Sequence, residues 1–598
     1  MRPSAWIVVA LVSAVLCGAE TAWGGGAEEG ARYRVLGESD LRDRFARYAA
    51  GDDELYTNAY SNVEAFDALK GAVPRFECPD ERLTDTYYFR WWTYRKHLKL
   101  TPSGWVVTEF LPDVGWAGKN NTIACPLGHQ VREGRWLSED AYLDDYIRFM
   151  VTEGCVNGPR TYVNWPAWSA RERAKVTGKK TYLFSLLPKF VANYAAWEKG
   201  WQWRGNKACA GLTNGLFQSI GDREGTEFAL SANGARPMVN AAMWAEASAI
   251  ASIAREAGEA ETAATFAAKA AALERAIKSR LWNAERSFFT TESADGRRDS
   301  VCELHGYAPF YFRMPLGGDY AEAWRPLTDE RGFLAPKGLT FPRRDTPGFV
   351  VSHDCRQHEC QWNGPSWPYA TSITLTALYE TLQDGLALPL EGDAFARLLG
   401  QYAAQHRLTR DDGATVPWID ENLDPFTGRW LARDLMIEAD RTGARKMRYR
   451  ERGKDYNHST FCDLVISGLC GLVPRDDGEI VVKPLAPKAW DWWCVDGVRY
   501  HGKNVTILFD RDGTRYGKGK GLVVLSEKAE DIPVVSHVGY EGTLPKFYFD
   551  DVPAYPFIDL CGCTEMFPTP CIGPARFSTC CPSKASWPRR SGMGSTFS

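Results

Sequence analysis

Two short acidic segments hold the residues best suited to acid–base chemistry. Residues 221–228 read GDREGTEF and place three acids within six residues, among them Asp222 and Glu227. Residues 417–428 read PWIDENLDPFTG and place Glu421 between a tryptophan and a tight turn. A positioned carboxyl group can donate or accept a proton, so one acid from each segment could form a general acid and base pair. Taken alone, the first segment is more typical of a solvated loop and the second of a plain turn.

A third segment, residues 361–369, reads QWNGPSWPY. Its Gly-Pro step fixes a turn, and Pro368 fits the first turn of a following helix, where a missing N–H costs nothing. Trp362 and Trp367 flank this rigid turn, with Asn363 inside it. Two tryptophans held in this way would form a platform for a sugar ring, and they would serve equally well as core packing.

Aromatic residues are abundant in this chain of 598 residues, which has 23 Trp, 25 Tyr and 28 Phe. Tryptophan offers a flat apolar face and an N–H donor, a combination that suits sugar rings, although a large aromatic core would need the same residues. The net charge of −4 gives no attraction to nucleic acid or to an acidic membrane. Composition therefore favours a carbohydrate partner over a nucleic acid.

The N-terminus is typical of an export signal. Arg2 precedes an apolar run over residues 5–16, and small residues follow it. This pattern predicts a signal peptide over residues 1–24 and a mature protein in the periplasm or outside the cell. Cys17 would instead make the protein a lipoprotein, although Leu16 is a poor fit before a lipidated cysteine. No later segment predicts a transmembrane helix.

The 16 cysteines show no CxxC pair, so the sequence predicts no zinc site. Export permits disulfides, and Cys355 and Cys360 are close enough in sequence to pair across a loop. The acidic loops would permit a structural calcium ion. We predict no other metal and no cofactor.

Helical periodicity dominates residues 136–475, and the helices come in pairs joined by short turns. Such pairs predict a bundle, a solenoid or a closed toroid of α/α hairpins. No strict repeat of 20 to 50 residues occurs, which argues against a regular solenoid. The expected helices cover residues 138–150, 165–176, 182–198, 239–257, 260–281, 367–382, 394–406 and 459–472.

The flanking regions have other patterns. Residues 27–135 predict a mixed segment of short strands and loops, packed on the helices and rich in aromatics around residues 87–92. Residues 476–545 predict a small antiparallel β domain, since short apolar runs alternate there with turn signals. Residues 560–598 are rich in Cys, Pro and Ser without periodicity, so we expect a disordered tail.

Three local patterns, in the same order along the chain, resemble the (α/α)6 inverting glycosidases related to glycoside hydrolase family 63. That group includes α-glucosidases and mannosylglycerate hydrolases. Residues 362–367 are similar to its W-x-G-P-x-W segment, which lines the sugar site. Residues 224–227 stand where the group has S-G-M-D or D-G-M-E, with Thr226 in place of Met and Glu224 in place of Ser or Asp. Residues 421–428 are similar to its E-N-Y-[ND]-P-x-T-G segment.

The resemblance implies a mainly α six-hairpin toroid over residues 136–475 and an exported, inverting hydrolase of α-linked glycosides. It implies that Glu227 is the general acid and Glu421 the general base, with Asp222 as the alternative acid. Inverting enzymes separate such carboxyl groups by about 6.5–9.5 Å to admit a water molecule. Arg236 would orient the acid or bind a sugar hydroxyl.

Further substrate contacts are expected from the polar and aromatic residues of the same loops and of the N-terminal segment. These residues are Trp362, Asn363, Trp367, Trp91, Trp92, His129, Glu133, Trp418 and Asn457. For at least one of Arg90, Trp91 and Trp92, packing in the core is the favoured alternative.

Two other functions fit part of the pattern. A sugar epimerase or lyase on the same toroid would rely on His or Tyr bases. The chain has only nine His, and its two carboxylate loops favour hydrolysis. A non-catalytic glycan-binding protein would keep the tryptophans and tolerate the loss of either acid. The presence of both Glu227 and Glu421 favours a hydrolase.

Overall fold

The computed structural model describes residues 34–154, 162–200, 211–351, 358–444, 446 and 448–526, together with two strands at 534–536 and 546–548. The predicted signal peptide and the tail from residue 560 lie outside these ranges. Within them, no helix combines the length and the apolar character needed to cross a membrane.

Eight helices of the described residues contact one another in a closed circuit, which runs through α4, α16, α5, α7, α10, α12, α13 and α14 and returns to α4. Other helices pack outside this circuit, where α2 contacts α4, α6 contacts α7, and both α9 and α11 contact α10. The ring of paired helices confirms the predicted mainly α toroid.

The bounds of the helices are as follows. The α-helices are α2 (Ser39–Gly51), α3 (Ala65–Leu69), α4 (Glu81–Lys96), α5 (Leu127–Gly134), α6 (Ala141–Thr152), α7 (Pro166–Thr177), α8 (Lys180–Ser185), α9 (Leu187–Lys199), α10 (Pro237–Glu256), α11 (Ala260–Ala276), α12 (Ala308–Tyr311), α13 (Pro368–Gln383), α14 (Ala394–Gln405), α15 (Leu431–Arg441) and α16 (Phe461–Asp463). The 3-10 helices are η1 (Lys119–Asn121), η2 (Gly221–Glu224), η4 (Leu304–Tyr307) and η5 (Gly318–Leu327), and the π-helices are η3 (Ile277–Leu281) and η6 (Leu464–Leu469).

Helix α4 differs from the expected mixed segment, because the aromatic run at residues 87–92 is helical. Asp80 caps the helix, and its carboxylate accepts hydrogen bonds from the backbone N–H of Arg82 at 2.9 Å and of Leu83 at 3.4 Å. Nearly every residue from Leu83 to Lys96 is buried. A helix that is buried all round shows no apolar stripe, so its periodicity is hidden in the sequence.

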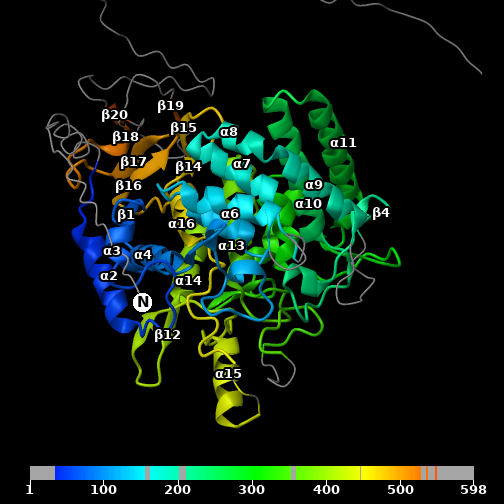
Figure 1. The fold of residues 1–598 in the computed structure, drawn as a ribbon, viewed down its shortest axis with the longest axis horizontal. Coiled ribbons are helices and arrows are strands. Elements are labelled where there is room, and N and C mark those ends of the chain that lie inside the picture. The colour runs from blue at the N-terminus through cyan, green and yellow to red at the C-terminus, as the bar shows by residue number, and fades with distance from the viewer. Residues whose placement is uncertain are drawn as a thin grey trace, which may run out of the picture. The chain divides into compact units, whose positions relative to one another are not determined.

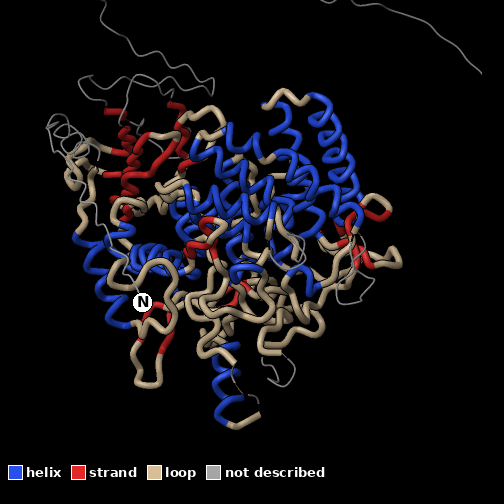
Figure 2. Tube along the Cα trace, in the orientation of Figure 1, coloured by secondary structure: helices blue, strands red, loops and turns tan. Residues whose placement is uncertain are grey.

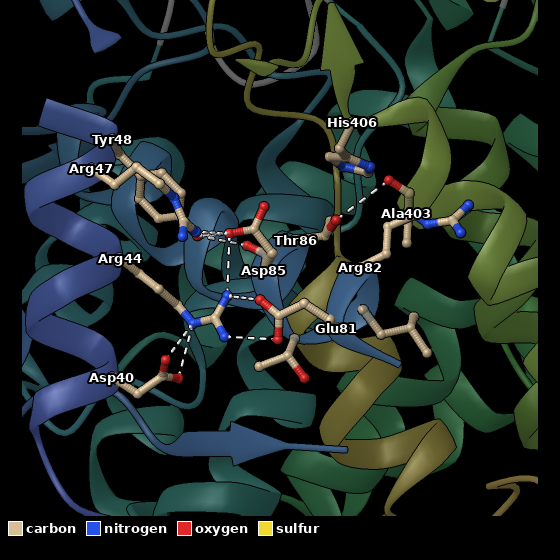
Figure 3. A network of polar contacts seen from close by, with 12 residues as sticks. Asp40, Arg44, Arg47, Tyr48, Glu81, Arg82, Asp85, Thr86, Ala403 and His406 are labelled. Atoms are coloured by element: carbon tan, nitrogen blue, oxygen red, sulfur yellow. Dashed lines mark hydrogen bonds and ion pairs between the residues drawn. The ribbon is translucent and has the colours of Figure 1, made fainter. Parts of the chain in front are cut away.

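A network of charged side chains joins α2 to α4 (Figure 3). The Arg44 guanidinium lies 2.9 Å from Asp40 on its own helix and 2.7 Å from Glu81 on α4. The Tyr48 hydroxyl donates to Asp85 at 2.7 Å. Only 7% of the Arg44 side chain is exposed, so these bonds fix α2 on the outside of the ring.

The described C-terminal strands form the predicted β domain, which Figure 1 shows in orange beside the blue N-terminal helices. The main sheet has the order β1-β16-β17-β18-β20, antiparallel except for the parallel pair β18–β20. Strand β16, residues 492–500, was not anticipated, and β1 brings residues 75–77 of the N-terminal segment to the edge of the sheet. A second sheet has the order β14-β15-β19.

The strands have the following bounds. They are β1 (Arg75–Glu77), β2 (Leu98–Thr101), β3 (Gly104–Val107), β4 (Leu212–Thr213), β5 (Leu216–Phe217), β6 (Gly234–Ala235), β7 (Trp282–Asn283), β8 (Phe288–Phe289), β9 (Glu292–Ser293), β10 (Leu334–Ala335), β11 (Gly338–Leu339), β12 (Arg407–Thr409), β13 (Thr415–Pro417), β14 (Leu472–Val473), β15 (Ile480–Val482), β16 (Trp492–Tyr500), β17 (Lys503–Asp510), β18 (Gly521–Ser526), β19 (Val534–Ser536) and β20 (Lys546–Tyr548).

Long loops gather at the ends of the helices away from the β sheet (Figure 2). The loop after β3 leads into α5, the loop around η2 leads into α10, and residues 358–367 lead directly into α13. Residues 448–460 lead into α16, and residues 418–430 lead into α15. Because α5, α10, α13 and α16 all belong to the inner circuit, the segments before them can meet at one mouth of the ring.

Candidate active site

A cavity of about 280 Å³ brings these loops together. Both acidic segments and the tryptophan turn contribute to its wall, and so do residues from the segments before α5 and α16. Its lining residues are Glu109, Phe110, Trp116, Ile123, Cys125, Tyr162, Asp222, Gly225, Glu227, His358, Glu359, Cys360, Trp362, Trp367, Glu421, Arg452, Tyr456 and His458.

Glu227 is bound to the tryptophan turn through its side chain and its backbone. The indole N–H of Trp362 donates to Glu227 Oε2 at 3.2 Å, and the backbone N–H of Trp362 donates to the Glu227 carbonyl at 3.0 Å. Burial raises the pKa of Glu227 to about 7, and the nearby Asp222 carboxylate adds to the rise. A carboxyl group with this pKa retains a proton near neutral pH, as a general acid must.

The loop that carries Glu227 has its shape fixed at Gly225. This residue has φ +67°, and a Cβ at this position would lie 3.3 Å from Cys125 Sγ and 3.5 Å from the Trp367 ring. Glycine adopts such a left-handed conformation without steric cost. The turn closes where Thr226 N donates to the Gly221 carbonyl at 2.9 Å. The EGTE sequence therefore places Gly225 against the tryptophan turn and Glu227 in the cavity.

Arg236 lies behind this loop and does not line the cavity. Its guanidinium is 2.8 Å from Glu224 and 3.5 Å from Glu303, and it donates to the Thr226 hydroxyl at 3.2 Å. Burial alone would raise the pKa of Glu224, but the charge of Arg236 lowers it below its usual value. Of the two roles expected for Arg236, its position fits support of the acid loop.

Loss of the Arg236 charge should destabilise the fold strongly. In Arg236→Gln, the buried Glu224 and Glu303 carboxylates would lose their cation, which costs about 3–5 kcal/mol for a buried pair. Urea denaturation measures this change in the free energy of unfolding. The matched control is Arg325→Gln, because Arg325 pairs with Glu322 on the surface, where both side chains are largely exposed. Equal losses in the two variants would contradict the supporting role of Arg236.

Glu421 lies among groups different from those around Glu227. It forms an ion pair with Arg452, which also pairs with Glu359. The thiol of Cys360 donates to Glu421 Oε2 at 3.0 Å. An ionised carboxylate accepts such bonds, and this is the form a general base requires. Cys360 is a free cysteine, and its suggested partner Cys355 lies outside the described residues.

The two tryptophans of the third motif form a stacked wall. The ring centroids of Trp362 and Trp367 are 4.3 Å apart at an interplanar angle of 26°, and Tyr369 stacks behind Trp367 at 4.5 Å. Both tryptophans reach the cavity. The wall can therefore bind the apolar face of a sugar ring while Trp362 holds Glu227.

A third part of the wall was not predicted. Glu109 Oε1 lies 2.6 Å from His458 Nε2, and the Tyr456 hydroxyl donates to the same oxygen at 3.3 Å. Burial raises the pKa of Glu109 to about 8, and the negative charge of Glu421 adds to the rise. These residues lie far apart in the sequence and have no motif of their own. The one local indication is that His458 directly follows Asn457, which was among the predicted substrate contacts.

Four of the predicted contacts lie outside the cavity lining. Trp91 and Trp92 pack in the core on α4, at 0% and 2% exposure. Trp418 donates to Asp420 at 3.3 Å and lies beneath Arg433. Asn363 is also absent from the lining, and its backbone carbonyl accepts a hydrogen bond from Val350 N at 2.9 Å.

Three further predicted contacts also have partners within the toroid. His129 stacks on Tyr369 with ring centroids 3.9 Å apart. Glu133 accepts hydrogen bonds from Cys462 N at 3.1 Å and from Asp463 N at 3.0 Å, at the start of α16. The Asn457 amide accepts a hydrogen bond from Arg90 at 3.2 Å. Their partners lie on α13, α16 and α4, and none of the three residues lines the cavity.

The described residues contain no group of three or more His, Cys, Asp or Glu side chains arranged to hold a metal ion. Five carboxyl groups line the cavity, and two of them, Glu227 and Glu421, come from the two predicted loops and share the cavity with the stacked tryptophans. Glycosidases that cleave with two carboxyl groups place such a pair on the two sides of the scissile bond.

A helical toroid with such a cavity is the architecture of a class of glycoside hydrolase domains. Residues 119–459 match the mannosylglycerate hydrolase MGH1-like glycoside hydrolase domain. The chain belongs to this family, as the three motifs predicted. Residues 474–526, in the β domain, match the C-terminal domain of glycosyl hydrolase family 65.

Solved structures share the architecture. One described as a sialidase is 32% identical with a TM-score of 0.74, over 84% of this chain and 44% of that one. A family 78 rhamnosidase of Bacillus sp. GL1 is 16% identical with a TM-score of 0.52, over 79% of this chain and 43% of that one. The chain thus spans less than half the length of either protein, and the rhamnosidase shows similarity of fold alone.

Proposed function

We propose that the protein hydrolyses an α-linked glycosidic bond with inversion, with Glu227 as the general acid and Glu421 as the general base. The observation that carries this proposal is the contrast between two carboxyl groups of one cavity. Burial raises the pKa of Glu227 to about 7, whereas Glu421 forms an ion pair with Arg452. Environments that separate an acid from a base in this way support these two roles.

In the proposed reaction, Glu227 donates its proton to the glycosidic oxygen while the bond from this oxygen to the anomeric carbon breaks. Glu421 accepts a proton from a water molecule as the water oxygen bonds to the anomeric carbon from the opposite face. The products are an alcohol and a sugar of inverted configuration. Transfer of a proton through solvent from Glu421 to Glu227 restores the starting state.

The first test combines activity with stereochemistry. The wild-type protein is incubated with a panel of α- and β-linked oligosaccharides and small glycosides, and released reducing sugar is measured. For a cleaved substrate, proton NMR identifies the first anomer formed, before mutarotation. We expect an α-glycoside to yield the β-anomer. A retained anomer would contradict the inverting mechanism, and binding of glycans without cleavage would favour a glycan-binding protein.

The pH dependence of hydrolysis should show the ionisation of the acid. The proton on Glu227 is required for cleavage, and it is lost as the pH rises through about 7. We therefore expect kcat/KM to fall above about pH 7, approaching a tenfold loss per pH unit. Initial rates between pH 5 and 9 measure this limb. A rate that stays constant to about pH 9 would contradict the assignment.

We also propose that the protein acts outside the cytoplasm, which rests on the signal-peptide pattern of residues 1–24. Cell fractionation of a host that expresses the full chain tests this proposal. A product that keeps residues 1–24 and stays in the cytoplasm would contradict it.

A further inference from the structure

The proposed reaction leaves the pair of Glu109 and His458 without a role. Both residues line the cavity, and their side chains are 8% and 1% exposed. They approach from opposite ends of the sequence, since Glu109 follows β3 and His458 precedes α16. Glu421 influences the pKa of both residues, so the pair lies near the proposed base.

The bonds of Glu109 differ from those of the structural acids nearby. Glu224 uses both carboxylate oxygens within the protein, one for Arg236 and one for Val239 N. Glu133 likewise accepts a backbone N–H on each oxygen. In Glu109, both contacts within the described residues, from Tyr456 and His458, fall on Oε1. Its second oxygen therefore has hydrogen-bonding capacity to spare.

His458 is also incompletely bonded. Both ring nitrogens, Nδ1 and Nε2, are buried without a hydrogen bond among the described residues, although Nε2 lies 2.6 Å from Glu109 Oε1. Tyr456 packs on its ring with centroids 3.9 Å apart, and Tyr369 lies on another side at 5.2 Å. A buried polar atom without a partner is costly, so it is expected to find one when a ligand binds.

We propose that Glu109, which is in contact with His458, binds a hydroxyl group of the sugar ring that lies between Glu227 and Glu421, and so determines which sugar is accepted. The inference rests on the proposed function, because it places the cleaved ring in this cavity. The second oxygen of Glu109 accepts a hydrogen bond from the hydroxyl, while the His458 ring stays in contact with Oε1 of the same carboxyl group. A sugar without that hydroxyl leaves a buried carboxyl oxygen unpaired.

The test combines a variant of the enzyme with modified substrates. Monodeoxy analogues of a glycoside that the wild type cleaves are assayed with the wild type and with Glu109→Gln. We expect one deoxy position to lower the wild-type kcat/KM by roughly 10- to 100-fold. Glu109→Gln should cleave the parent glycoside more slowly than the wild type does. In this variant, removal of the same hydroxyl should lower kcat/KM by less than about threefold further. A purely structural role would not produce this dependence on one hydroxyl.

Asp113→Asn is the matched control, since it changes a carboxyl group on the same segment whose side chain is 81% exposed. With each deoxy analogue, it should lose the same factor in kcat/KM as the wild type does. His458→Gln is the second variant, in case Glu109→Gln does not fold, and it should reduce the penalty at the same position. Deoxy penalties that are equal in the wild type and in the folded variants would overturn the inference.

The outcome separates this inference from the proposed function. If the wild type cleaves no glycoside, the proposed function fails. Calorimetric binding of the parent and deoxy monosaccharides to the wild type and Glu109→Gln then takes the place of kinetics. Loss of the wild-type preference for one hydroxyl in the variant would support the inference, and an unchanged preference would overturn it.

Discussion

The Glu421→Gln variant is expected to lose hydrolysis by about 10⁴-fold in kcat, with its fold and substrate affinity preserved. The amide keeps the shape of the side chain but cannot accept a proton from water. Arg452 would then retain Glu359 as its anionic partner, so the charge around it is only partly lost. Single-turnover rates and binding of the intact substrate measure the two quantities separately.

Glu359→Gln is the control for this variant. It removes the other carboxylate of Arg452 from the same cavity and leaves the Glu421 pair in place. We expect this change to lower kcat by less than about tenfold, since it does not touch the proposed proton acceptor. If Glu359→Gln were as inactive as Glu421→Gln, the base assignment would be wrong or shared.

The Glu227→Gln variant should lose activity according to the leaving group. On glycosides of ordinary alcohols, we expect a loss of about 10³-fold, because the departing oxygen receives no proton. Fluoride leaves a glycosyl fluoride with little need of an acid, so the variant should cleave these substrates at rates within about tenfold of the wild type. With the fluoride, the loss of rate above about pH 7 should also disappear.

Asp222→Asn separates the two candidate acids. The Asp222 carboxylate raises the pKa of Glu227, so its removal should move the alkaline limb of kcat/KM to lower pH while activity below the limb persists. If Asp222→Asn instead shows the leaving-group dependence and Glu227→Gln does not, Asp222 is the acid. Initial rates for both substrate classes decide between the two.

The convergence of the three motifs could be predicted because each pattern is local. The Gly-Pro turn of residues 364–365, the Gly225 turn and the turn after Glu421 each specify a short backbone shape. The resemblance to the family implied a ring of helices, and such a ring brings the three turns together at one end. The paired helices α10 and α11 were also visible, since small residues and a capping glycine mark their turn.

The rest depended on contacts between distant segments. Arg452 reaches Glu421 from a loop that has no motif, and Glu109 meets His458 across about 350 positions. No local pattern encodes such pairs. Trp91 and Trp92 were expected near substrate, yet α4 is buried on all sides and encloses them. Composition shows that tryptophans are present, but only packing decides which of them reach the cavity.

Trp362 touches Glu227 through its indole and its backbone, and this has a consequence for how the family can diversify. The indole bond lowers the pKa of the acid, while the same ring forms part of the sugar wall. A lineage that replaces this ring to accept a different sugar also releases Glu227 to a higher pKa, and its working pH range shifts upward. New specificity at this position is therefore inherited together with a new pH range, unless a second change near Asp222 restores the old one.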